Sequence, residues 1–98
     1  MPKRVVVCTG TVDCLILYCP GCRELHQVGV RGDGPIWMWD GNEELPTLSP
    51  SIRVYDAQGT RCHSFVRSGQ IEFLGDCRHE LAGKTVDLPD YEEWREIW

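Results

Sequence analysis

Four of the six cysteines in this 98-residue chain are spaced as ligands of a single metal ion. Cys19 and Cys22 are separated by a Pro-Gly pair, and such a tight turn sets two thiolates on one edge of a tetrahedral zinc ion. Zinc then needs two further ligands from a distant segment, and Cys62 and Cys77 are suitably placed to provide them. The sequence therefore predicts one structural Zn²⁺ ion held by Cys19, Cys22, Cys62 and Cys77.

The segment between Cys62 and Cys77 explains how these two residues come together. Two short alternating runs, residues 62–66 and 70–74, are joined by Arg-Ser-Gly, which predicts a β-hairpin. Closing this hairpin brings Cys62 back beside Cys77. Three histidines compete with a cysteine for the fourth ligand position: His26, His63 and His79. The two other cysteines, Cys8 and Cys14, lie in or beside apolar runs and are expected to be buried.

The pattern of apolar residues predicts a mostly β fold. Short runs rich in β-branched and aromatic residues are separated by turn residues, and they are too short for helices. These runs are residues 5–8, 15–18, 25–30, 36–39, 51–55, 62–66 and 70–74. Near the C-terminus Asp90 and Glu93 have the spacing of a capping box, which predicts a helix within residues 88–98. We expect a small α+β domain spanning residues 1–98, with antiparallel hairpins around the zinc knuckle and a short C-terminal helix.

Charge and hydropathy limit the partners of the chain. The formal net charge is −5, which argues against a nucleic-acid ligand because such binding normally needs a basic surface. The apolar runs are far shorter than the roughly 20 residues of a membrane-spanning helix. We therefore expect a cytoplasmic protein with neither a nucleic-acid nor a membrane partner, and its partner or substrate is expected to be another protein. In the cytosol disulfides are rare, so clustered cysteines favour metal binding.

Side chains suited to hydrolysis occupy the same segments as the second pair of cysteines. A hydrolase needs a nucleophile, a base within hydrogen-bond reach and a group that orients the base. Ser51 or its neighbour Ser49 is a candidate nucleophile, and His63 is a candidate base. Asp76 or His79 would assist. The alternative is structural: the serines satisfy backbone groups in a loop, and the histidines donate hydrogen bonds to the cysteine sulfurs.

Two other functions are compatible with the same residues. In a non-enzymatic interaction module, zinc would only build the scaffold, and tryptophans would supply the binding surface. The candidates are Trp37, Trp39, Trp94 and Trp98. A catalytic zinc would instead need an open coordination position and only three protein ligands. We rank this last, because the cysteines already fill the site.

Five segments together resemble a small phage and prophage family of unknown function, whose members are often labelled ammonia monooxygenase. The segments are Cys-Pro-Gly-Cys at 19–22, Trp-Met-Trp-Asp-Gly-Asn at 37–42, Pro-Thr-Leu-Ser-Pro-Ser at 46–51, Cys-His-Ser-Phe-Val at 62–66 and Gly-Asp-Cys-Arg-His-Glu-Leu-Ala-Gly at 75–83. The resemblance covers about residues 15–90. It implies a phage or prophage origin and a compact domain.

Distant relatives of that family resemble the peptidase component of bacterial ubiquitin-like conjugation operons. They share the paired cysteines, a Pro-Ser-Ile element and a later Cys-Ser-His-Phe element. Here Pro50-Ser51-Ile52 matches the second element, which favours Ser51 over Ser49 as the nucleophile. In the third element His63 and Ser64 stand in the reverse order. The resemblance implies a peptidase that acts on a ubiquitin-like protein or its conjugates, and a role in countering host defence.

Overall fold

The computed structural model describes residues 2–96 and contains two antiparallel sheets in that part of the chain. The first sheet has three strands in the order β1-β2-β3. Its strands are β1 Val6–Cys8, β2 Asp13–Cys19 and β3 Glu24–Arg31. Cys19 at the end of β2 pairs with Glu24 at the start of β3. The Cys-Pro-Gly-Cys segment therefore forms the tip of a hairpin.

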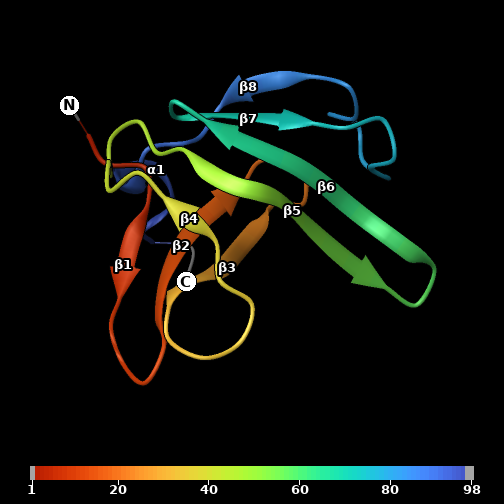
Figure 1. The fold of residues 1–98 in the computed structure, drawn as a ribbon. Helices are drawn as coiled ribbons and strands as arrows, with labels where there is room; N and C mark the ends of the chain where they lie inside the picture. The colour runs from red at the N-terminus through yellow and green to blue at the C-terminus, as the bar shows by residue number, and fades with distance from the viewer. Residues whose placement is uncertain (1, 97–98) are drawn as a thin grey trace.

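The second sheet has five strands in the order β4-β5-β6-β7-β8 (Figure 1). These strands are β4 Met38–Trp39, β5 Leu48–Asp56, β6 Gly59–Arg67, β7 Gln70–Phe73 and β8 Thr85–Asp87. The hairpin predicted around residues 62–74 is the β6–β7 pair. Strand β5 begins earlier than expected, and β8 was not expected. The mostly antiparallel β architecture confirms the expected fold class.

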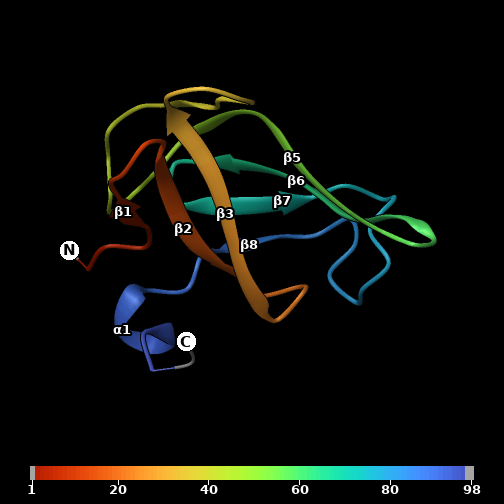
Figure 2. The same ribbon diagram turned by 90° about the horizontal axis from the view of Figure 1, so that it is seen from below.

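The two sheets pack face to face around one apolar core. Strands β2 and β3 cross over the strands of the second sheet (Figure 2). Because successive side chains of a strand point to opposite faces, alternate residues of the second sheet enter the core. Ile52, Val66 and Phe73 of the second sheet form one buried cluster with Leu15 and Leu17 of β2.

The helix is shorter than the sequence predicts. Helix α1 spans Tyr91–Trp94, and its start has the expected capping arrangement, because the Asp90 amide donates to Glu93 Oε1 at 3.1 Å. Trp94 is buried. The last two residues of the predicted helix, including Trp98, lie outside the described residues. Within residues 2–96, no helix has the length and apolar character needed to cross a membrane.

Candidate active site and metal-binding group

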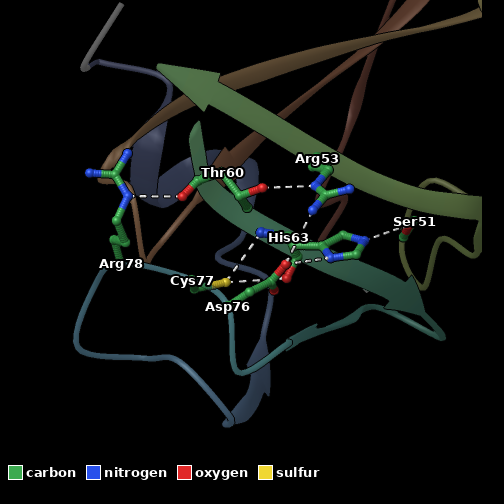
Figure 3. Close-up of polar contacts among 7 residues, drawn as sticks. All are labelled: Ser51, Arg53, Thr60, His63, Asp76, Cys77 and Arg78. Carbon is green, nitrogen blue, oxygen red and sulfur yellow. Dashed lines mark hydrogen bonds and ion pairs between the residues drawn. The ribbon is translucent and has the colours of Figure 1, made fainter. Parts of the chain in front are cut away.

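Ser51, His63 and Asp76 form a connected row of polar side chains on the outer face of the second sheet (Figure 3). Ser51 Oγ lies 2.9 Å from His63 Nε2. His63 Nδ1 lies 3.2 Å from Asp76 Oδ2. The His63 side chain is 20% exposed and that of Asp76 is 42% exposed, so the row is open to solvent at the aspartate end. Three of the four candidate catalytic residues are therefore in contact.

A bulge in β5 positions Ser51. Leu48 pairs with Val66 and Ile52 pairs with Ser64, so three residues of β5 face only one residue of β6. Pro50 lies in this bulge, where its missing amide hydrogen costs no ladder hydrogen bond. Bulges turn side chains away from their regular direction and are frequent beside active sites. Here the bulge leaves the Ser51 hydroxyl beside the imidazole of His63.

Strand alternation places His63 on the same outer face. In β6 the neighbours of His63, Cys62 and Ser64, are buried, whereas His63 itself is only partly covered. The reversed His-Ser order therefore leaves Ser64 in the core and the imidazole facing Ser51. Arg53, which pairs with His63 across the two strands, lies on this face as well.

The segment after β7 brings Asp76 to His63 by running back along β6. The Leu74 amide donates to the His63 carbonyl at 2.9 Å, and the Arg78 amide donates to the Arg61 carbonyl at 2.9 Å. The Arg78 guanidinium also donates from Nε to the Thr60 carbonyl at 2.8 Å. Asp76 lies between these two attachment points, so its carboxylate is held beside the imidazole.

Arg53 is a member of the site that the sequence interpretation did not include. Its Nη2 lies 3.6 Å from Asp76 Oδ2, and its Nε donates to Thr60 Oγ1 at 2.9 Å (Figure 3). The Asp76 carboxylate thus faces both an imidazole and a guanidinium. The available signal was positional, because residues two apart in a strand share a face and Arg53 follows Ser51 by two.

The direction of the two hydrogen bonds of the His63 ring determines whether the ring can accept a proton from Ser51. An ionised carboxylate only accepts hydrogen bonds, so Nδ1 of His63 carries the hydrogen that faces Asp76. Nε2 is then the unprotonated nitrogen, and it faces the Ser51 hydroxyl as an acceptor. This is the arrangement that removes a proton from a serine hydroxyl during nucleophilic attack.

A pocket of about 300 Å³ has Ser49, two residues before Ser51, in its lining. It lies between β4 and the start of β5, and it is lined by Met38, Trp39, Asp40, Thr47 and Ser49. Ser49 precedes Ser51 by two residues, across the bulge in β5. The indole of Trp37 donates to the Ser51 carbonyl at 3.2 Å, which ties the segment leading into β4 to the strand that carries Ser51.

A second group of chemically active side chains lies where the two sheets meet. One potential ligand atom from each of four residues lies within 4.8 Å of all the others, so the group can hold a metal ion. Its members are Cys19, Cys22, His26 and Cys62. The sulfur atoms of Cys19 and Cys62 are 4.0 Å apart, close to the roughly 3.8 Å expected between two thiolates on one tetrahedral zinc.

The thiols of this group are electrostatically coupled. A hydrogen bond from Cys62 lowers the pKa of Cys19 to about 4. The same bond, followed by burial and the charge of Cys19, raises the pKa of Cys62. Burial and then the charge of Cys19 raise the pKa of Cys22. Cys19 therefore loses its proton more easily than Cys22 and Cys62 do. A divalent cation bound to all three sulfur atoms would favour the thiolate form of each.

Cys77 and His79 lie beside this group, in a second set that shares Cys62. His79 Nε2 is 3.4 Å from the sulfur of Cys62, and the ring packs edge-on against Phe73. A Cβ added to Gly21 would clash with the His79 ring, so the glycine allows the ring to approach the Cys-Pro-Gly-Cys turn. His79 is therefore placed with the sulfur cluster and apart from Ser51.

The family model described as bacterial ubiquitination-like system serine protease (BubE) matches residues 1–74. This chain belongs to the BubE family. The matched residues include Ser51 and His63, and Asp76 follows two residues after the match ends. No curated protein and no solved structure matches the chain.

Proposed function

We propose that this BubE-family chain is a serine peptidase in which Ser51 is the nucleophile, His63 the general base and Asp76 the group that orients the imidazole. The observation that carries the proposal is the continuous row from Ser51 Oγ to His63 Nε2, at 2.9 Å, and from His63 Nδ1 to Asp76, at 3.2 Å. The serine protease description of the family supports the same chemistry.

In the proposed reaction, Ser51 Oγ attacks the carbonyl carbon of the scissile bond while its proton moves to Nε2 of His63. The imidazolium is stabilised by the carboxylate of Asp76, whose Oδ2 atom also faces the Arg53 guanidinium. His63 then gives the proton to the leaving amine, and an acyl group remains on Ser51. A water molecule, deprotonated by the same imidazole, releases this acyl group as a carboxylate.

The proposed substrate is a ubiquitin-like protein or one of its conjugates, in keeping with the ubiquitination-like system that the family description names. A peptide chain that reaches Ser51 would pass the pocket beside β4, where the apolar surfaces of Met38 and Trp39 suit an apolar side chain next to the scissile bond. We propose a phage or prophage origin and a cytoplasmic site of action, where the activity would counter a host conjugation system.

The metal-binding group fits a structural zinc ion. Its sulfur-rich, largely buried donor set is typical of such sites, and Cys19, Cys22 and Cys62 are common to the sequence-based ligand set and to the four-residue group. The zinc would hold thiolates of both sheets together. The peptide bond is cleaved by the residues of the row, which are separate from this group.

A fluorophosphonate probe tests the nucleophile directly, because it reacts with a serine that a neighbouring base activates. We expect the wild-type protein to be labelled on Ser51, as located by peptide mass spectrometry, and Ser51→Ala and His63→Ala to remain unlabelled. Ser49→Ala is the matched control, since Ser49 lies on the same strand two residues away and is exposed. It should be labelled like the wild type.

Each result bears on the proposal. Labelling of Ser51→Ala, or equal labelling of His63→Ala and the wild type, would disprove the proposed roles. Retention of the wild-type thermal melt by Ser51→Ala would show that loss of labelling reflects loss of chemistry. Hydrolysis of a fluorogenic C-terminal conjugate of a ubiquitin-like protein then tests the substrate class separately.

A further inference from the structure

We infer that the metal ion is held by Cys19, Cys22, Cys62 and His26, with His26 in the position that the sequence interpretation gave to Cys77. The inference concerns metal coordination and does not rest on the peptidase proposal. It depends on how each candidate for the fourth position already uses its polar atoms.

His26 has a buried imidazole directed at the cluster. Its residue is only 7% exposed, and within residues 2–96 its Nε2 has no hydrogen-bond partner. A buried polar atom without a partner is costly, and proteins normally avoid it. One nitrogen of this ring lies within 4.8 Å of the sulfur atoms of all three cysteines in the group. A metal ion bound through Nε2 among the three sulfur atoms would give this nitrogen a partner.

Cys77 already has a complete set of partners as a neutral thiol. Its sulfur lies 3.2 Å from the amide nitrogen of His63 and 3.2 Å from the carbonyl oxygen of the same residue. A thiol accepts from the amide and donates its hydrogen to the carbonyl. A thiolate has no hydrogen to donate, so as a metal ligand Cys77 would place its negative charge beside that oxygen. The contacts of Cys77 therefore suit a thiol.

His79 is also committed to other partners. Its Nδ1 accepts the Leu81 amide hydrogen at 3.2 Å, so the ring hydrogen must be on Nε2. That nitrogen points at the sulfur of Cys62 at 3.4 Å and serves as a hydrogen-bond donor to it. A histidine in this role stabilises a metal-bound thiolate without binding the metal. His26 is then the remaining nitrogen donor.

The four ligands come from both sheets. Cys19 ends β2, Cys22 lies in the following turn and His26 lies on β3, whereas Cys62 belongs to β6 of the second sheet. The spacing from Cys22 to His26 is four residues, so the first three ligands belong to one hairpin. The metal would thus attach this hairpin to β6.

Cobalt substitution of the full-length protein tests this ligand set, because thiolate-to-cobalt absorbance rises with the number of sulfur ligands. We expect the wild-type protein to give the spectrum of a cobalt ion with three sulfur ligands and one nitrogen ligand. Cys77→Ala should give the same spectrum and should bind the metal with an affinity within about threefold of the wild type. His26→Ala should weaken binding by more than about 100-fold, beyond the roughly 10–100-fold typical of changes around the ligands. His79→Phe should fall in that smaller range.

His26→Cys keeps the test decisive where His26→Ala fails to fold. It should bind one cobalt ion with a four-thiolate spectrum, more intense than that of the wild type. Cys14→Ala, which removes a buried thiol outside the cluster, should leave the spectrum unchanged. Loss of one thiolate from the spectrum in Cys77→Ala, or an unchanged spectrum in His26→Cys, would overturn the proposal, as would failure of the wild type to bind cobalt or zinc.

Discussion

At the level of single residues, the Asp76 carboxylate faces the His63 imidazole and the Arg53 guanidinium. These contacts underlie its proposed role of orienting the imidazole. The carboxylate faces Nδ1 of His63 at 3.2 Å and Nη2 of Arg53 at 3.6 Å. Its Oδ2 atom makes both contacts and fixes which imidazole nitrogen carries the hydrogen. An amide in the same place would let the ring adopt the other tautomer, with its hydrogen toward Ser51.

Asp76→Asn should therefore lower the rate constant of the acylation step by about 10⁴-fold, with the fold retained because the side chain is half exposed. Second-order rate constants for fluorophosphonate labelling of Ser51 measure the effect, and the melting temperature checks the fold. Asp33→Asn, a change in an exposed loop residue, is a matched control and should react as the wild type does. An equal rate for Asp76→Asn would contradict the role of the carboxylate.

Much of this residue-scale arrangement was predictable from local patterns. The hairpin of residues 62–74 returns the chain to its starting point, and that alone puts Asp76 near His63. Arg53 and His26 were harder to place. Arg53 acts through a strand pairing between β5 and β6, and the direction of the His26 ring depends on how the two sheets pack. The spacing of Arg53 from Ser51 indicates a shared face, but neither the contact of Arg53 with Asp76 nor the direction of the His26 ring can be read from residue spacing.

At the level of elements, turn chemistry was the most informative signal. Ser68 and Gly69 join β6 to β7 with φ of 50° and 78°, so both turn residues are in the left-handed region. This is the turn that suits the twist of a two-residue hairpin. A Cβ on Gly69 would also meet Leu45 Cδ2 at 2.8 Å. The hairpin that carries the histidine therefore depends on this glycine.

Gly69→Ala should destabilise the protein by at least about 1–2 kcal/mol, the cost of a left-handed conformation for a residue with a Cβ. The midpoint of urea unfolding, at constant slope, measures the change. Gly75→Ala is the control, because a Cβ there would meet no heavy atom within 4 Å. It should shift the midpoint by much less. A Gly69→Ala protein as stable as the wild type would contradict the role of the turn.

Other elements were missed for identifiable reasons. Strand β8 has three residues, Thr85–Asp87, which is too short for an alternation pattern, and it forms by pairing with β7. Strand β5 begins at Leu48 although prolines flank this stretch, because a bulge accommodates Pro50 where a regular central ladder would not. Pairing with a neighbouring strand determines both the existence of β8 and the start of β5. Such pairing cannot be predicted from the sequence of one short segment.

At the level of the whole molecule, the metal-binding group and the proposed catalytic row meet on strand β6, and Cys77 beside the group adjoins the other end of the row. Cys62 immediately precedes His63, and Cys77 immediately follows Asp76. The Cys77 sulfur also accepts the His63 amide hydrogen at 3.2 Å. Any change in the backbone around Cys62 must therefore move the imidazole. The geometry of the row should therefore depend on a metal bound at the group, even though the proposed reaction does not use that metal.

Metal removal should then abolish both the fold and the labelling of Ser51. Structural zinc contributes about 10–16 kcal/mol of apparent folding free energy, which is comparable with the whole stability of about 5–15 kcal/mol expected for a domain. We expect a chelator to remove the cooperative thermal melt, and fluorophosphonate labelling of Ser51 to decline in parallel with the bound zinc. Added zinc should restore both, whereas chelator already saturated with zinc should have no effect.

A metal-free protein that melts cooperatively and labels at the wild-type rate would show that the cysteine cluster is dispensable. A metal-free protein that melts cooperatively but no longer labels would show that the metal positions His63 without being needed for the fold.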